Sequence, residues 1–576
     1  MAKYTMGDSY DLPAMLASLD LERDAECPEL IWLEESRGEP DRFWDAVFRW
    51  AQLNGRGLQT RRHTHYELYL DLVERHRGSN AVAMLWWERE GMRTLTFDEL
   101  AARSLRCAEA WVRQGVKPGV RVALALSVGC EYLVAFCALL CLGANVMVVD
   151  PGPPNAMLHQ VRLSQATKIV RSEFGNGEPI IDGVAAIRVT SEGKPRTVRP
   201  HAYQPQEPCW WTLSPLSTRP GTPVSARCAF ESALSDATFA LRLDARSRLA
   251  TPGWSLRQYQ PSLISACLLA GCAFVHVTLE QLRAKPSLLV DAKVTCLGTS
   301  HGLLRAIGAE SRPLATVEHL VRPVDEPLDW ASCRDFLSHT DLNRVPCSSL
   351  LMDAALGGSV LFSTRRKGIF SARVLPSVGR RFSLNDASTG ESEGITNTGV
   401  LQLQTEPHAA TAQNGSEPAK PEAFLLLARC GNEWFYGGTI SPRRGSHCYP
   451  VDYVVASVER MSGVTGACVV PVPQMTAHGF WMFSLLVFVE SLQDGPSTAQ
   501  IESILGSEIG SEAIPDRIEV VPFHPRRAKR KVDIAWYERR YQTSRLSRLF
   551  RASPYHLLSS LRSRLTGPNP SCGCPA

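Results

Sequence analysis

Residues 95–126, LTFDELAARSLRCAEAWVRQGVKPGVRVALAL, decide the fold class of this chain. Thr96 predicts the start of a helix, because its side chain can cap the backbone amide of Glu99 while Glu99 reaches back, an arrangement called a capping box. Gly115 predicts the end of that helix, and a short turn leads into an apolar strand over 120–126. A helix followed by an apolar strand is the repeating unit of a layered α/β domain.

The next stretch, residues 132–149 (YLVAFCALLCLGANVMVV), is about long enough to cross a membrane. However, Glu131 precedes this stretch and Gly143 interrupts it, which favours a core helix over 130–142 followed by a glycine turn and a buried strand. Helices and apolar strands continue to alternate over 95–310, which predicts a largely parallel sheet.

The predicted fold class is α/β, with a large layered N-terminal domain of mostly parallel sheets and a small α+β C-terminal domain. Composition and patterning divide the chain into four segments: a helical N-terminal extension packed on the main body (1–80), the large domain (81–438), the small domain (439–543) and a basic tail (544–576). Within the large domain, residues 404–422 are polar and rich in helix- and strand-breaking residues, which indicates a surface insert.

Composition excludes some partners. The net charge of +4 is too small to indicate specific nucleic-acid binding, and the basic excess lies near the C-terminus. The tail predicts either a solvated segment or a basic amphipathic helix in weak contact with a membrane surface or a partner. No apolar signal segment opens the sequence, so we expect a cytoplasmic protein whose 17 cysteines are free thiols.

Several segments, in order, resemble the adenylate-forming (AMP-binding) superfamily of acyl-CoA synthetases, fatty-acyl-AMP ligases, luciferases and peptide-synthetase adenylation domains. They are 95–126, 131–154, 252–254 with 268–274, 293–305, and 445–452, where Tyr449, Pro450 and Asp452 match the fatty-acyl-AMP ligases. The resemblance implies ATP- and Mg²⁺-dependent activation of a carboxylic acid, including fatty acids, to an acyl-adenylate. The acyl group would then pass to CoA or to a carrier-protein thiol.

The phosphate loop of this family, roughly T-S-G-[ST]-T-G-x-P-K-G, corresponds here to residues 211–224, WTLSPLSTRPGTPV. Its lysine is missing: aligning Pro220 leaves Gly221 in that place, and aligning Pro223 leaves Val224. The resemblance assigns nucleotide binding in this degenerate loop to four residues: Ser214, Ser217, Thr218 and Gly221. Two arginines, Arg219 and Arg227, are either substitutes for the lysine or surface residues in a turn.

Two carboxylates of the family, the metal-binding acid and the ribose-binding aspartate, also have no clear counterpart. The metal-binding acid has two competing positions, Asp353, which is either a metal ligand or a solvated helix residue, and Arg365, whose charge would repel a metal. The ribose-binding aspartate has no counterpart in residues 424–429, and Thr439 stands where an arginine is expected. We therefore predict no metal-ligand set.

One cation of the family is retained. Residues 524–533, HPRRAKRKVD, keep a proline, a lysine and a valine of the small domain's lysine motif, which makes Lys531 the catalytic candidate. The alternative is a solvated basic run. The resemblance further assigns the acyl-pocket wall to Trp254, Gly298 and Thr299.

Two hypotheses remain open. The chain is either a divergent acyl-adenylating ligase that uses Lys531, or a catalytically impaired pseudoenzyme that binds an acyl ligand or another protein. Removing one positioned charge costs roughly 10²–10³ in rate, so three or four losses favour impaired chemistry. The serine-hydrolase pattern G-x-S-x-G and the zinc pattern H-E-x-x-H do not occur.

Overall fold

The computed structural model divides the chain into two compact units, Met1–Ser441 and Pro442–Ala576. It describes residues 33, 36, 38–53, 57–149, 151, 154–171, 184–190, 198–213, 223–254, 259–307, 314–326, 330–353, 356–363, 365–368, 370, 373–380, 382–386, 398–403, 424–430, 433–439, 443–444, 447–476, 479–522, 525, 527–528, 531–533 and 536–537. The insert 404–422 and the tail 544–576 lie outside these residues, so the predictions for them stay predictions.

The predicted capping box is confirmed. The Glu99 backbone N–H donates to Thr96 Oγ1 at 3.2 Å, and the Thr96 N–H donates to Glu99 Oε2 at 2.8 Å. Helix α5, Phe97–Arg113, follows, and Gly115 has a φ of +82°, the left-handed conformation that ends helices. The strand after it is β3, Arg121–Ala125, one residue shorter at each end than predicted.

The apolar run 132–149 lies in the core. It forms helix α6, Cys130–Cys141, and strand β4, Asn145–Val148, and every residue of α6 from Tyr132 onward is buried. In the described part of the chain, no helix is long and apolar enough to cross a membrane.

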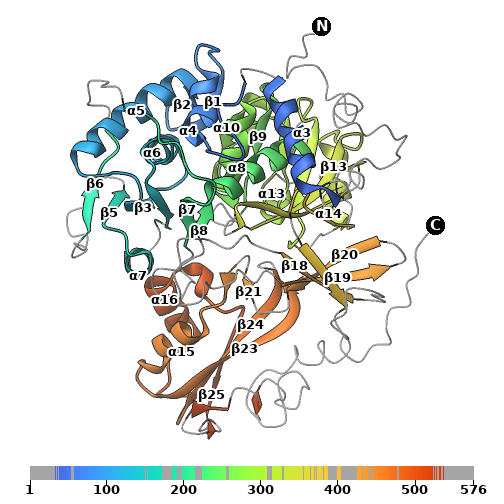
Figure 1. Ribbon diagram of the computed structural model, residues 1–576. Coiled ribbons are helices and arrows are strands. Elements are labelled where there is room, and N and C mark those ends of the chain that lie inside the picture. The colour runs from blue at the N-terminus through green and yellow to red at the C-terminus, as the bar shows by residue number, and fades with distance from the viewer. Residues whose placement is uncertain are drawn as a thin grey trace. The chain divides into compact units, whose positions relative to one another are not determined.

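The first sheet of the large unit has six strands, in the order β6-β5-β3-β4-β7-β8, and all pairs except β7–β8 are parallel. The remaining strands are β5 (Lys168–Arg171), β6 (Ala185–Ile187), β7 (Pro208–Thr212) and β8 (Pro223–Ser225). Helices α5 and α6 pack beside each other next to this sheet, and helix α7 (Pro154–Ser164) contacts β3 (Figure 1).

The second sheet has ten strands. Its centre, β13-β12-β11-β9-β10-β1, is parallel throughout, and antiparallel strands flank it on both sides. The strands are β1 (Val82–Glu88), β2 (Gly91–Thr96), β9 (Arg248–Ala250), β10 (Ala273–His276), β11 (Cys296–Gly298), β12 (His319–Pro323), β13 (Pro346–Asp353), β14 (Gly358–Phe362), β15 (Arg366–Lys367) and β16 (Leu375–Pro376). The predicted parallel α/β architecture is therefore confirmed.

Further helices pack in two hydrophobic cores, α3, α4, α8 and α10 in the main one and α11 to α14 in a second one. They are α3 (Pro40–Leu53), α4 (Leu68–Leu72), α8 (Ala226–Ser235) with a π-helical turn (Asp236–Ala240), α10 (Ser262–Ala270), α11 (Leu279–Ala284), α12 (Leu288–Asp291), α13 (His301–Ile307) and α14 (Trp330–His339). Phe43 and Trp44 of α3 are buried in the same core as α8, and the Phe43 ring lies 5.8 Å from that of Phe239. A smaller sheet follows, with strands β17 (Phe382–Asp386), β18 (Thr398–Leu403), β19 (Phe424–Cys430) and β20 (Glu433–Thr439).

The second unit is a small α+β domain, as predicted. Its three-stranded sheet pairs β24 (Gly479–Val489) antiparallel with β23 (Val464–Thr476) and parallel with β25 (Arg517–Val521). The other elements are α15 (Val451–Glu459), α16 (Thr498–Glu508) and two short hairpins, β21 (Arg443–Arg444) with β22 (His447–Cys448) and β26 (Arg527–Ala528) with β27 (Lys531–Val532). The 12 cysteines whose state the structure gives, in both units together, are all free thiols.

Candidate functional site

The predicted phosphate-binding segment connects strands β7 and β8. These strands pair antiparallel, with Trp210 opposite Val224 and Trp211 opposite Pro223. Because β7 also pairs parallel with β4, the connection leaves the sheet at the carboxyl end of a parallel strand, where α/β sheets bind ligands. The four candidate nucleotide-binding residues lie in this connection, outside the described residues: Ser214, Ser217, Thr218 and Gly221. Their role stays a prediction.

Unpaired polar atoms are concentrated at the end of β7. Nε1 of Trp210, Nε1 of Trp211 and Oγ1 of Thr212 are buried and have no hydrogen-bond partner among the residues that the structure describes. Each such group costs about 1–3 kcal/mol of stability. The guanidinium carbon of Arg121 lies 4.9 Å from the centre of the Trp211 ring, so a cation also lies near this edge.

Helix α8 begins directly after β8. Ser225 caps it, because the backbone N–H of Cys228 donates to Ser225 Oγ at 3.2 Å. The interpretation of Arg227 as a surface residue in a turn was wrong: it lies in the first turn of α8, and its Nε is 3.3 Å from Glu231 Oε1. The arginine and glutamate are one helical turn apart, which brings their side chains together.

The predicted acyl-pocket residues lie together at the carboxyl ends of β9 and β11. Trp254 Nε1 donates to the backbone oxygen of Thr299 at 3.4 Å. A Cβ atom added to Gly298 would lie 2.9 Å from Trp254 Cε2 and 2.8 Å from Thr251 Cγ2, so only glycine permits this close approach. The rings of Trp254 and Tyr259 are 4.7 Å apart. Their role as an acyl-pocket wall stays a prediction.

Two acidic residues near this wall were missed by the sequence analysis. Asp325 and Glu326 follow β12, the strand beside β11. Tyr259 Oη donates to Asp325 Oδ1 at 3.4 Å, and the His301 backbone N–H donates to Glu326 Oε2 at 3.0 Å. Burial raises the pKa of Glu326 to about 7. Their position after an apolar parallel strand was a usable signal, since such strand ends carry functional residues.

The interpretation of Asp353 as a solvated helix residue was wrong. Asp353 is buried at the end of strand β13, opposite Gly358 of β14, because the apolar run before it is a core strand. The competing Arg365 donates from Nη2 to the Ala240 backbone oxygen at 3.4 Å. Across the described parts of both units, no three His, Cys, Asp or Glu side chains form a group that could hold a metal.

The catalytic candidate Lys531 lies in the second unit. Its backbone is in β27 and pairs with that of Ala528 in the hairpin with β26. Its catalytic role stays a prediction.

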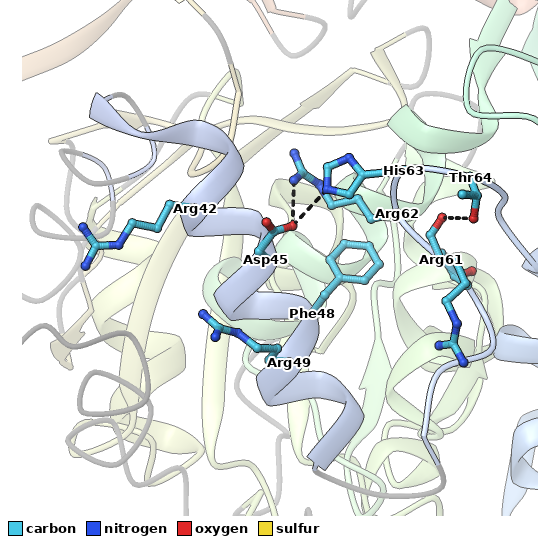
Figure 2. A pocket seen from close by; sticks show the side chains of 9 residues that line it. Arg42, Asp45, Phe48, Arg49, Arg61, Arg62, His63 and Thr64 are labelled. Carbon is cyan, nitrogen blue, oxygen red and sulfur yellow. Dashed lines mark hydrogen bonds and ion pairs between the residues drawn. The ribbon is translucent and has the colours of Figure 1, made fainter.

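A groove of about 880 Å³ lies between α3 and the segment 60–64 (Figure 2). Arg62 is its centre, with a side chain only 4% exposed that bonds Asp41 at 2.8 Å, Asp45 at 3.0 Å and Glu231 of α8 at 3.0 Å. In Figure 2, Arg62 and His63 converge on Asp45, whereas Arg42 and Arg49 point away from them. Three carboxylates neutralise the buried arginine. The ion pairs of Arg62 therefore connect α3 to α8, and we interpret this groove as structural.

Comparisons with known proteins agree with this geometry. Residues 73–212 match the family model described as AMP-binding enzyme. Salicyl-AMP ligase / salicyl-S-ArCP synthetase from Mycobacterium tuberculosis is 38% identical over 91 residues, which are 16% of this chain and only 16% of that relative's length.

Two solved structures share the fold. A double mutant of o-succinylbenzoate CoA synthetase (MenE) from Bacillus subtilis, bound with its product analogue OSB-NCoA, matches with a TM-score of 0.62 and 14% identity, over 82% of this chain and 98% of that chain. IdnL1 matches with a TM-score of 0.59 and 17% identity, over 80% of this chain and 99% of that chain.

The fold is therefore that of the two-domain adenylate-forming proteins. The family model matches residues 73–212, and the solved structures share the fold over about four fifths of this chain's length.

Proposed function

We propose that this protein is a divergent ATP-dependent ligase that activates a carboxylic acid as an acyl-adenylate. In this reaction a carboxylate oxygen attacks the α-phosphorus of ATP, an oxygen–phosphorus bond forms, and pyrophosphate leaves. The proposal assigns to Lys531 the role of the cation beside the reacting carboxylate and phosphate, where charge develops. The acyl group would then pass to the thiol of CoA or of a carrier protein, and AMP would leave.

One observation supports this proposal: the region that matches the AMP-binding model ends at strand β7, whose carboxyl end carries buried polar groups. The match to the AMP-binding model covers residues 73–212 and ends at Thr212, within the first two residues of the predicted phosphate-binding segment 211–224. The second sheet brings Trp254, Gly298 and Thr299 together at the carboxyl ends of its parallel strands. An acid held there would be enclosed by aromatic rings, as small-molecule sites commonly are.

The resemblance implies ATP and Mg²⁺, and the described residues fit the two groups unequally. Thr212, with an unpaired buried hydroxyl at the base of the connection, fits a ligand with hydrogen-bonding oxygens. The described residues do not fit the metal, because Asp353 is buried, Arg365 occupies the competing position, and no acidic group of three is present among them. No step is therefore assigned to Mg²⁺.

Exchange of labelled pyrophosphate into ATP, measured across a panel of carboxylic acids, tests the proposal. We expect exchange with at least one acid, and a loss of about 10²–10³-fold in Lys531→Ala. Lys529→Ala, in the same basic run, is the matched control and should keep its exchange rate. Absence of exchange across the panel, or equal rates in both variants, would contradict the assignment.

A second candidate function is a pseudoenzyme that binds an acyl ligand or another protein without turning it over. The specific observation in its favour is the missing lysine of the phosphate loop, where the sequence has Gly221 or Val224. Under this function, an acid would bind to the purified protein in the absence of any exchange.

A further inference from the structure

Thr251 and residues 260–265, around the start of helix α10, include several buried polar atoms that form no hydrogen bond within the described part of the chain. Gln260 is only 2% exposed, yet neither its Oε1 nor its Nε2 has a hydrogen-bond partner in the described parts of the large unit. The hydroxyl groups of three further buried residues are also unpaired: Thr251, Ser262 and Ser265. Buried polar groups in folded proteins are almost always hydrogen-bonded, so a local group of exceptions requires an explanation.

These residues adjoin the predicted acyl-pocket wall. Thr251 contacts the position of Gly298, since its Cγ2 would lie 2.8 Å from a Cβ added there. Gln260 follows Tyr259, whose ring packs on Trp254. The unpaired atoms are therefore part of the same strand end and helix start that hold the wall.

The N-terminus of α10 adds further polar groups to this region. Its N-cap is Pro261, and no side chain caps the helix. Ser262 and Ser265 are three residues apart on α10, so they lie on the same side of the helix. These groups suit a polar ligand group and not a hydrocarbon chain. They are the positive end of the helix dipole, two hydroxyls, and a carboxamide that can both donate and accept hydrogen bonds.

We propose that Gln260, with Ser262 and Ser265, recognises a hydrogen-bonding group on the tail of the bound carboxylic acid. The substrate class is thus a hydroxy- or amido-substituted acid, and an unsubstituted fatty acid is a poor ligand. An apolar tail would leave the carboxamide and the hydroxyls unpaired, and sites built to hydrogen-bond a substrate reject analogues that lack the group by large factors. This inference rests on the proposed function, because it names the substrate class of the same site.

Binding of matched acid pairs to the full chain, measured by calorimetry without ATP, tests the substrate class. The pairs are salicylate with benzoate, 3-hydroxybutyrate with butyrate, and 3-hydroxydecanoate with decanoate. We expect the hydroxylated member of at least one pair to bind at least about 100-fold more tightly. In Gln260→Leu this preference should fall to less than about 10-fold. Equal binding within every pair, tighter binding of the unsubstituted acids, or no binding of any hydroxylated acid would overturn the inference.

Thermal unfolding of the ligand-free variants gives a second readout that does not depend on turnover. Because the carboxamide is unpaired, Gln260→Leu should raise the Tm by about 2 °C, and Ser265→Ala should not lower it. Ser104→Ala is the matched control and should lower the Tm, since Ser104 Oγ is buried and lies 2.9 Å from Tyr69 Oη and 2.7 Å from the Leu100 oxygen. A lower Tm in Gln260→Leu would show that the carboxamide is paired and would overturn the proposal.

The two tests separate the inference from the proposed function. Pyrophosphate exchange with unsubstituted acids alone would leave the ligase proposal standing and would reject the polar substrate class. Selective binding of hydroxylated acids without any exchange would reject the ligase proposal and would leave the recognition by Gln260 standing.

Discussion

Asp236 is a carboxyl group that the fold buries completely, in the π-helical turn after α8. The Ser359 backbone N–H donates to its Oδ2 at 3.0 Å, and the Ser359 hydroxyl also donates to the carboxylate. Burial raises the pKa of Asp236 to about 6, although the bonds from Ser359 and the charge of Arg380 act in the opposite direction. At neutral pH the carboxyl group is still mostly ionised, but its ionisation costs more free energy in the folded state than in the unfolded state.

The pH dependence of stability follows from this raised pKa. Between the ordinary value of 3.8 and about 6, the folded state holds a proton that the unfolded state releases. The stability contributed by Asp236 is thus complete below about pH 3.8 and is lost as the pH rises through 6. Asp236→Asn removes the titration, so from pH 4 to pH 7 its unfolding free energy should gain about 1–3 kcal/mol relative to the wild type. Urea unfolding at several pH values measures this gain, and parallel curves would contradict it.

At the scale of elements, one buried arginine links α3 to α8. Arg62 bonds Glu231, which is 169 residues away in sequence, and Tyr66 Oη donates to the same carboxylate at 3.2 Å. Removing one partner of a buried ion pair costs about 3–5 kcal/mol, and Glu231, although it keeps its ion pair with Arg227, would lose the bond from the more deeply buried Arg62. Arg62→Met should therefore destabilise the large unit by about that amount in urea unfolding.

Two further variants control this prediction. Arg42→Met changes an arginine of α3 that forms an exposed ion pair with Glu39 at 3.5 Å, and it should cost less than about 1 kcal/mol. Adding Glu231→Gln to Arg62→Met should restore part of the loss, because it removes the buried carboxylate that has lost its bond from Arg62. Equal costs for Arg62→Met and Arg42→Met would mean that the link contributes nothing.

At the scale of the whole molecule, the two hypotheses for function differ in whether nucleotide binds the folded chain. A ligand at about 100 times its Kd stabilises the folded state by about 2.7 kcal/mol. If the ligase proposal holds, millimolar Mg-ATP should raise the Tm, and Lys531→Ala should bind nucleotide while losing exchange. Thermal unfolding with and without Mg-ATP measures this, with Mg²⁺ alone as the control. An unchanged Tm would favour the pseudoenzyme.

The sequence by itself determined the elements and their layering. Thr96 and Glu99 predicted a helix start that the structure confirms, and Gly115 predicted its end, because capping and left-handed turns depend on a few neighbouring residues. The apolar run 132–149 was correctly assigned to the core, since Glu131 and Gly143 are local signals. The order of such segments was enough to indicate the superfamily.

Only the tertiary structure decided which polar residues are buried and what they meet. The burial of Asp353, the bond from Arg62 to Glu231 and the unpaired carboxamide of Gln260 depend on contacts between segments far apart in sequence. Hydrophobic periodicity reports which face of an element is apolar, but it does not report which residues of another element lie against that face. The sequence therefore identified only some of the residues of the candidate site, and the contacts of these residues became known only from the tertiary structure.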